Sequence, residues 1–171
     1  MTLHVLSKRP SILPTPYQAA GQGKVTPRLP LATILVIDDD VDMMRIMMHT
    51  LAVAGYRALP ARGGLEALRQ LRATRPDLVV TDLTMSDMSG VEVIARIKRD
   101  PETGRIPVLA VTASQHDEQA QSAGLAGCDG YVGKPLHGTM LLSAVERALA
   151  RSRSPYSSGG HRPDVPPDLC A

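Results

Sequence analysis

The sequence contains no tryptophan and no phenylalanine, and its aromatic residues are four tyrosines. A hydrophobic core must therefore be built from aliphatic residues, alanine and the eight methionines. No apolar run approaches the roughly 20 residues that span a membrane, and the first ten residues lack the apolar stretch of a secretion signal. Two cysteines give no disulfide framework, which is typical of a reducing compartment. These absences predict a cytoplasmic protein without a membrane anchor.

Acidic residues are missing from the first part of the chain, and this explains the formal net charge of +2. Residues 1–31 carry four basic residues and no acidic one, whereas residues 32–151 hold 13 basic and 15 acidic residues. No stretch of that central segment forms the clustered basic face of a nucleic-acid-binding domain. We therefore predict no nucleic acid partner.

A length of 171 residues suits one domain with additional segments and is too short for two ordinary domains. Residues 1–31 are rich in proline and basic residues, and residues 152–171 are rich in serine, glycine and proline. Both segments are predicted to be disordered tails that flank a domain at residues 32–151. Solvated extensions are favoured over docking arms, and Cys170 falls in the second tail.

Between the tails, short apolar strands alternate with amphipathic helices five times. Strands are expected at residues 34–37, 57–60, 78–81, 106–111 and 131–132. The second belongs at the edge of a sheet because Pro60 cannot donate to a ladder. The expected helical stripes are Met44, Met47, Met48 and Leu51; Leu65, Leu68 and Leu71; Val91, Ile94 and Ile97; and Leu141, Val145, Ala148 and Leu149. Residues 115–126 offer almost no large apolar anchor, so the fourth helix should be the least stable element. This alternation predicts an α/β fold with a parallel sheet.

Polar residues follow four of these strands, at Asp38 and Asp39, Asp82, Thr112 and Lys134. In an open parallel sheet, ligands bind outside the carboxyl ends of the strands, so these groups should meet there. Clustered carboxylates repel one another unless a cation neutralises them, and their oxygen atoms suit a divalent ion. The lysine and the threonine can hold an anion beside that ion. A metal with an anion indicates phosphoryl chemistry at Asp82.

These residues resemble the receiver domain of two-component response regulators. The resemblance covers about residues 32–151, and the order and spacing of five segments carry it: Ile34–Asp40, Pro76–Asp82, Met85 to Gly90, Pro107–Ala113 and Gly130–Pro135. Within the family, Ala126–Asp129 is most similar to single-domain regulators of the cell-division and sporulation-relay kind. The resemblance implies a flavodoxin-like, doubly wound, five-stranded parallel sheet in the order 2-1-3-4-5, with five helices.

The resemblance also implies a role for each site residue. Asp82 would accept a phosphoryl group from a phosphohistidine of a histidine kinase or a histidine phosphotransfer protein. Mg²⁺ would be held by Asp39 directly, Asp38 through water, Asp82, and the backbone carbonyl of Thr84. The remaining implied roles are pairing with the phosphoryl group for Lys134, receiving it for Thr112 and the Ala113 amide, and switching for Tyr131. Simple packing of Tyr131 on the sheet remains an equal alternative.

Several positions depart from the family's pattern or have a plainer interpretation. Ser86 stands where proline is usual and Ser89 where an acid is usual, so the rigidity of the loop after Asp82 and its metal affinity should differ. Thr84 and Ser114 occupy positions that, in the family, flank the path of the water that hydrolyses the acyl phosphate. Asp40 and Asp42 are expected to favour the positive N-terminus of the first helix instead of binding metal. The remaining polar candidates are expected at the surface: Asp87, His4, His49, His116, His137 and His161.

Three functions from different classes stay open. The first is a phosphoacceptor signalling protein, not an enzyme with a separate substrate, which docks an effector through its fourth helix, fifth strand and fifth helix. The second is a degenerate receiver that acts only as an interaction module. The third is a phosphatase with an aspartate nucleophile, which is disfavoured because Thr84 stands where such enzymes need an acid. A flavin domain on the same fold is weaker still, since the acidic pocket would repel a cofactor phosphate.

Overall fold

The computed structural model describes residues 29–113 and 118–153. Most of both predicted tails lies outside these ranges, together with Ser114 and the residues His4, His116, His161 and Cys170. None of the helices in the described ranges is long and apolar enough to cross a membrane.

Strands and helices alternate along the described residues, as the apolar pattern predicts. The strands are β1 (Thr33–Ile37), β2 (Arg57–Ala61), β3 (Leu78–Asp82), β4 (Val108–Thr112) and β5 (Gly130–Gly133). The helices are α1 (Val41–Val53), α2 (Gly64–Thr74), α3 (Gly90–Arg99), α4 (Glu118–Leu125) and α5 (Gly138–Arg153). The expected fourth strand begins two residues too early, because β4 starts only after Pro107, which has no N–H for the ladder.

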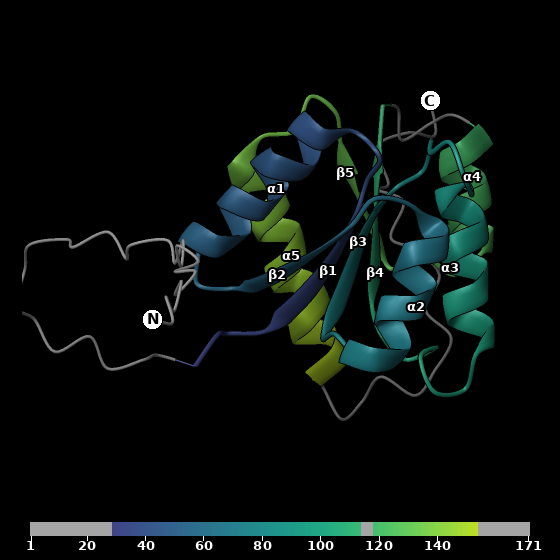
Figure 1. Cartoon of the computed structure of the whole chain (residues 1–171), viewed down its shortest axis with the longest axis horizontal. Coiled ribbons are helices and arrows are strands. Elements are labelled where there is room, and N and C mark those ends of the chain that lie inside the picture. Colours follow the sequence, from purple (N-terminus) through teal and green to yellow (C-terminus); the bar gives the residue numbers. More distant parts are fainter. Residues whose placement is uncertain (1–28, 114–117, 154–171) are drawn as a thin grey trace, which may run out of the picture.

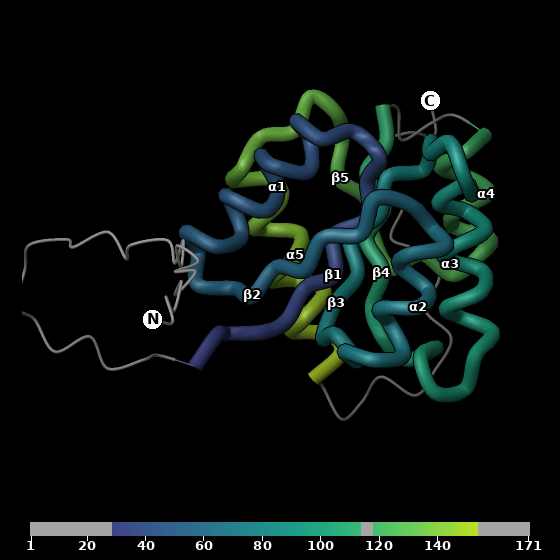
Figure 2. The backbone as a smooth tube through the Cα atoms, in the orientation of Figure 1, coloured from purple at the N-terminus to yellow at the C-terminus, as the bar shows by residue number. Residues whose placement is uncertain are grey.

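The strands form one parallel sheet in the order β2-β1-β3-β4-β5. Helices α1 and α5 cover one face, and α2, α3 and α4 cover the other (Figures 1 and 2). β2 lies at the edge, where the missing N–H of Pro60 is tolerated. The predicted flavodoxin-like fold and its strand order are therefore confirmed.

Two layers of aliphatic side chains hold the sheet between its helices. On one face, Met47 and Leu51 of α1 and Leu141 and Val145 of α5 are fully buried against β1 and β3. On the other face, α2 turns Ala67 and Leu71 towards the sheet, whereas Leu65 at its start is 53% exposed. The leucines of α2 thus share a side of the helix, but that side is only partly in the core.

Helix α4 is short and attached by small side chains. Its buried residues are Ala120 and Ala123, and Leu125 at its end is 92% exposed. The expected lack of large anchors is confirmed, and the low stability that follows from it stays a prediction.

Candidate functional site

The carboxylates of Asp38, Asp39 and Asp82 lie together at the carboxyl edge of the sheet. Strands β1 and β3 are neighbours with Ile37 opposite Thr81, so the residues that follow them emerge side by side. One carboxylate oxygen from each aspartate lies within 4.8 Å of the others. The structure therefore brings together the acidic group predicted from the strand ends.

Asp38 is the most deeply buried of the three, with 1% of its surface exposed. Its Oδ1 accepts a hydrogen bond from the Asp40 amide at 2.9 Å. Its Oδ2 is buried and has no hydrogen-bond partner; among the described residues, no other buried side-chain oxygen or nitrogen lacks one. Burial, reinforced by the negative charge of Asp82, raises the pKa of Asp38 from 3.8 to about 6. An ionised carboxylate here is destabilised unless a cation neutralises it.

Asp82 is buried beside a lysine. Its Oδ1 accepts a hydrogen bond from the Leu83 amide at 2.8 Å, and its Oδ2 lies 3.0 Å from the Nζ atom of Lys134. Lys134 follows β5, and its amide donates to the carbonyl of Thr112 at the end of β4. The ends of β3, β4 and β5 therefore bring the Lys134 ammonium group against the Asp82 carboxylate.

Thr112 and Ala113 lie at the end of β4, next to the strand that carries Asp82. Thr112 is buried and pairs with Gly133, whereas Ala113 is exposed. Both residues therefore lie beside Asp82 and Lys134 at the carboxyl edge of the sheet, and their predicted role is to receive a phosphoryl group. Their contacts with such a group stay predictions.

The loop after β3 forms hydrogen bonds with Asp39 of the acidic group and with helix α4. The amide of Ser86 donates to Oδ2 of Asp39 at 2.8 Å. A proline at this position has no N–H to donate, so this departure from the family pattern provides Asp39 with a partner. The hydroxyl of Thr84 donates to the side-chain oxygen of Gln119 on α4 at 3.0 Å. The loop thereby connects the acidic pocket to α4.

Asp87 caps the N-terminus of helix α2, a role that the sequence did not predict. Its carboxylate accepts hydrogen bonds from the amides of Gly64 and Leu65, both at 3.1 Å, and so caps α2 from 22 or more residues away. These hydrogen bonds, that of Leu65 first, lower the pKa of Asp87. Its side chain is exposed as expected, but its capping role was missed. The sequence did contain a hint of this role. Helix α2 begins at Gly63-Gly64, and because neither glycine has a side chain to cap the helix, another residue has to do so.

Ser89 and Gly90 fix the start of α3 against the site. The Ser89 hydroxyl accepts a hydrogen bond from the Glu92 amide at 3.2 Å and caps the helix. A Cβ atom on Gly90 would overlap the carbonyl oxygen of Asp82, so only glycine allows the helix to approach the strand end this closely. Ser89 therefore replaces the usual acid with an N-cap, away from the carboxylate cluster.

Asp40 and Asp42 belong to the first helix, as the sequence predicts. Asp40 is the N-cap of α1 and accepts hydrogen bonds from the amides of Asp42 and Met43. These bonds lower the pKa of Asp40. Asp42 forms an exposed pair with Arg45 at 3.4 Å. Among the described residues, neither aspartate joins the cluster, and His49 and His137 are exposed outside it.

Tyr131 links β5 to α4. Its hydroxyl donates to the backbone carbonyl of Ala120 at 2.8 Å, and burial raises the pKa of its phenol to about 12. The side chain is half-buried. A tyrosine in this position holds α4 by a hydrogen bond, which complements the few apolar contacts of that helix.

The donor set fits a hard divalent cation. Three carboxylates offer oxygen ligands within a small volume, and the unpartnered Oδ2 of Asp38 is a buried negative atom that a cation would satisfy. Mg²⁺ needs few protein ligands because it keeps several of its waters. The acidic group is therefore consistent with the predicted magnesium site, to which the Thr84 carbonyl remains a predicted addition.

Comparison with known proteins is decisive for the family. The model of the response regulator receiver domain matches residues 34–146, which include the whole site. The chain belongs to the response regulator receiver family. Receiver domains are typically phosphoacceptors in two-component signalling and do not turn over a separate substrate, and the family implies a cognate kinase as partner.

Individual receiver proteins are similar over the same region. The polar-differentiation response regulator DivK of Brucella anthropi is 31% identical over 68% of this chain and 95% of its own length. The chemotaxis protein CheY4 of Vibrio cholerae is 29% identical, with a TM-score of 0.66 over 68% of this chain and 98% of the solved one. A solved putative response regulator from Chloroflexus aurantiacus is 34% identical, with a TM-score of 0.66 over 71% and 98%. The similarity of this receiver to DivK agrees with the resemblance to single-domain regulators.

Proposed function

We propose that this receiver accepts a phosphoryl group on Asp82 from a phosphohistidine of a histidine kinase or a phosphotransfer protein. The observation that carries the proposal is the position of the Asp82 carboxylate between the Lys134 ammonium and an acidic pair with an unpartnered buried oxygen. The Lys134 ammonium on one side and a cation held by the acidic pair on the other would offset the negative charge that is added when a phosphoryl group reaches the carboxylate.

In the proposed reaction, one carboxylate oxygen of Asp82 forms a bond to phosphorus as the bond from phosphorus to the histidine nitrogen breaks. The electron pair of the broken bond stays on that nitrogen, so a phosphohistidine protonated at its other ring nitrogen leaves as a neutral histidine, and Asp82 becomes an acyl phosphate. Lys134 pairs with a phosphoryl oxygen, and the Thr112 hydroxyl and the Ala113 amide donate hydrogen bonds to the others. Asp38, Asp39, Asp82 and the Thr84 carbonyl would hold Mg²⁺, which when bound offsets charge on the phosphoryl oxygens.

The approach to this pocket supports docking of a phosphodonor protein. A groove of about 330 Å³ opens beside the acidic pair and has apolar walls with two arginines; it is lined by Asp38, Asp39, Val41, Met44, Arg45, Met48, Pro60 and Arg62. A partner that brings a phosphohistidine to Asp82 has an apolar surface here to bury.

The output of the phosphorylated state is proposed to pass through α4, β5 and α5. The hydrogen bond from Tyr131 to Ala120 and the few anchors of α4 make this side easy to rearrange, so phosphorylation can shift the population between two arrangements. An effector would dock on this face, where a groove of about 450 Å³ is lined by Tyr131, Val132, Thr139, Met140, Ser143 and Arg147. A cytoplasmic location stays a prediction from the composition.

The test is incubation of the full chain with acetyl phosphate, with and without Mg²⁺, followed by measurement of intact mass. We expect a gain of one phosphoryl group that requires Mg²⁺ and is absent in Asp82→Asn. Asp77→Asn is the matched control, because Asp77 lies at the opposite edge of the sheet, where it accepts a hydrogen bond from the Thr33 amide. No gain in folded wild type, with a phosphorylated phosphotransfer protein also tried, would instead favour a degenerate receiver that acts only as an interaction module.

A further inference from the structure

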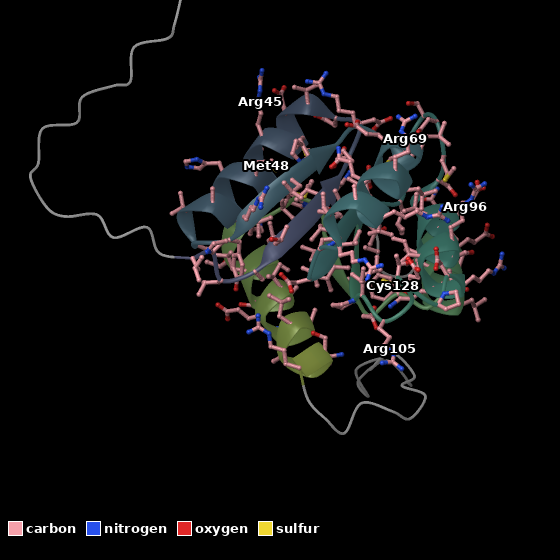
Figure 3. The ribbon with its side chains drawn as sticks, turned by 60° about the horizontal axis from the view of Figure 1, so that its bottom comes forward. Arg45, Met48, Arg69, Arg96, Arg105 and Cys128 are labelled. Carbon is pink, nitrogen blue, oxygen red and sulfur yellow. The ribbon has the colours of Figure 1, made fainter. Side chains whose placement is uncertain are left out.

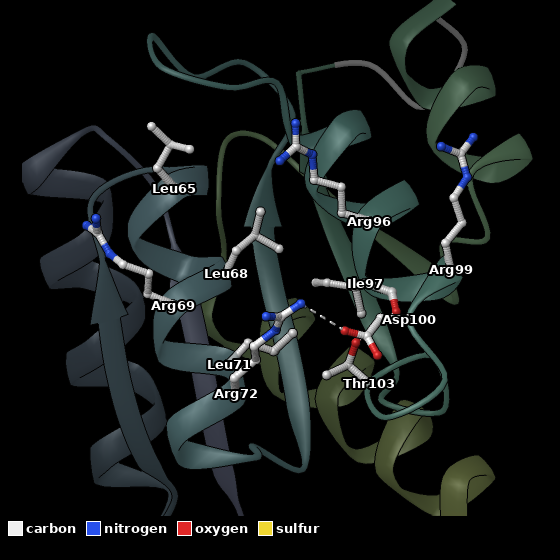
Figure 4. Close-up of a pocket in the computed structure, with 10 residues that line it drawn as sticks. All are labelled: Leu65, Leu68, Arg69, Leu71, Arg72, Arg96, Ile97, Arg99, Asp100 and Thr103. Carbon is white, nitrogen blue, oxygen red and sulfur yellow. Dashed lines mark hydrogen bonds and ion pairs between the residues drawn. The ribbon is translucent and has the colours of Figure 1, made fainter.

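A groove of about 660 Å³ runs between α2 and α3 and shares no lining residue with the acidic pocket. Its lining combines apolar residues with four arginines: Leu65, Leu68, Leu71, Ile97, Arg69, Arg72, Arg96, Arg99, Asp100 and Thr103 (Figure 4). The proposed phosphoryl chemistry uses none of these residues. The groove therefore needs an explanation of its own.

The floor of the groove is apolar, and its side chains become more exposed from the buried Leu71 and Ile97 to Leu65 at the open side. Leu71 and Ile97 are 2% and 1% exposed and belong to the core, while Leu68 is only partly buried against it. Leu65 is 53% exposed at the open side. Covering Leu65 and Leu68 with a partner's apolar side chains would remove this surface from water, which is favourable.

The rim of the groove is positively charged. Arg72 pairs with Asp100 at 3.5 Å, and Arg96 pairs with Glu92 on its own helix. The side chains of Arg69 and Arg99 form no hydrogen bond or ion pair with any residue of the described ranges. Figure 3 shows Arg69 and Arg96 extending outward from α2 and α3. Two guanidinium groups in excess, one on each wall, leave the rim short of acidic partners.

We propose that this groove docks an amphipathic helix of a partner protein whose apolar stripe is flanked by glutamate or aspartate. The stripe covers Leu65 and Leu68, and the flanking carboxylates pair with Arg69 on one wall and Arg99 on the other. Helix-in-groove recognition uses this combination of an apolar floor and charged flanks, and the planar guanidinium group suits carboxylates.

Other occupants fit this surface less well. The first 31 residues of the chain carry four basic residues and no acidic one, so the rim arginines repel them. Single-stranded nucleic acid is usually held by aromatic side chains that stack on bases, and the groove lining contains none. An acidic helix satisfies both the charge and the apolar character.

The test measures fluorescence anisotropy of three labelled peptides of about 18 residues, a length of five helical turns. The first has leucines spaced to form one stripe and glutamates beside it, the second replaces the glutamates with lysines, and the third keeps the glutamates but replaces the leucines with serines. We expect the full chain to bind the first peptide and to bind the other two at least about tenfold more weakly.

Variants locate the binding on the groove. Arg69→Ser combined with Arg99→Ser should weaken binding of the first peptide about tenfold, since two ion pairs are lost, and Leu65→Ser should weaken it as well. Arg57→Ser combined with Arg151→Ser removes the same charge from β2 and α5, at exposed residues outside the grooves described above, and should change the affinity less than about twofold. Circular dichroism checks that every variant is folded.

Any of the following peptide results overturns the proposal: no binding of the first peptide to the wild type at about 1 mM, equal binding of the lysine peptide, or equal loss in the two double-arginine variants. Tighter binding of a single-stranded oligonucleotide, lost in the Arg69 and Arg99 variant, also overturns it and assigns the groove to nucleic acid.

Discussion

Two lysine–aspartate pairs lie at opposite edges of the same sheet and differ in their surroundings. At the amino edge, Lys98 and Asp129 are 2.6 Å apart, and at the carboxyl edge, Lys134 and Asp82 are 3.0 Å apart. Lysine is otherwise absent from residues 32–151, where the remaining basic residues are arginines. The two pairs have the same chemistry, so their surroundings must explain the difference.

The amino-edge pair is satisfied within the fold. Asp129 also accepts a hydrogen bond from the Val108 amide at 2.7 Å, and Lys98 also donates to the carbonyls of Ile106 and Gly104. The carboxyl-edge pair instead has one carboxylate oxygen of Asp38 and one of Asp39 within 4.8 Å of an Asp82 oxygen, and Oδ2 of Asp38 has no hydrogen-bond partner in the described part of the chain. The Lys98–Asp129 pair is therefore surrounded by hydrogen bonds within the fold, whereas the Lys134–Asp82 pair lies beside a buried carboxylate oxygen of Asp38 that a cation could neutralise.

The largest expected effect is on the rate of phosphorylation, which should depend on Lys134 but not on Lys98. Lys134→Gln should slow the mass gain with acetyl phosphate and Mg²⁺ about 100-fold, because the ammonium that neutralises the reacting oxygens is lost. Lys98→Gln should leave the rate unchanged, since its ammonium lies at the other edge. Equal slowing in both variants would contradict the division of roles.

The second effect is on stability at the amino edge. Asp129→Ala should lower the free energy of unfolding by about 2 kcal/mol, because the Val108 amide and the Lys98 ammonium both lose their acceptor. Urea denaturation measures it. Asp129→Asn keeps one acceptor oxygen and should lose less, so an equal loss in the two variants would argue against the hydrogen bonds as the cause.

At the carboxyl edge, removing a carboxylate should raise the stability of the fold instead of lowering it, and the size of this change should depend on pH. Because the pKa of Asp38 is raised to about 6, the folded protein binds its proton more tightly than the unfolded chain does. That contribution to stability is full below pH about 4 and is lost as the pH rises through about 6. Without metal at pH 7, Asp38→Asn should therefore be more stable than the wild type by about 2 kcal/mol.

Thermal unfolding in the presence of a chelator measures this difference between wild type and Asp38→Asn, which should nearly vanish at pH 4. Added Mg²⁺ should stabilise the wild type and have less effect on the variant. A difference that stays constant from pH 4 to pH 7 would show that the buried carboxylate is not its origin.

The smallest effect concerns the link from the site to α4. Tyr131→Phe removes the hydrogen bond to the Ala120 carbonyl, which is worth about 1 kcal/mol, and should speed amide hydrogen exchange in residues 118–125. Tyr56→Phe, on the opposite face of the sheet, serves as the control. If Tyr131 is a switch, phosphorylation should speed the same exchange in the wild type and change it less in Tyr131→Phe; no change in either supports simple packing.

Much of the fold and of the candidate site follows from local patterns. Uninterrupted apolar runs and turn residues predicted the five strands, and Pro60 predicted the edge. The acidic group at Asp38, Asp39 and Asp82 was predictable because parallel strands end at one edge of a sheet. Lys134 was predictable for the same reason.

The contacts that sequence reasoning missed join distant segments through single hydrogen bonds. Asp39 meets the Ser86 amide across 47 positions, Thr84 meets Gln119 across 35, and Asp87 caps α2 across 23 to Gly64. No periodicity encodes such contacts, because each depends on the course of one irregular loop. The missing cap side chains at Gly63 and Gly64 were the sole hint of a partner for α2.

The sequence by itself determined the order of strands and helices, the edge at which the polar residues gather, and the family, because hydrophobic periodicity and strand-end positions are local properties. Tertiary structure decided which carboxylate is buried without a partner and which lysine is held by the fold. It also assembled the arginine-rimmed groove from α2 and α3, whose basic residues are interspersed with apolar and acidic ones along the chain. These features depend on the packing of separate elements, which fixes burial and hence the local strength of charge interactions.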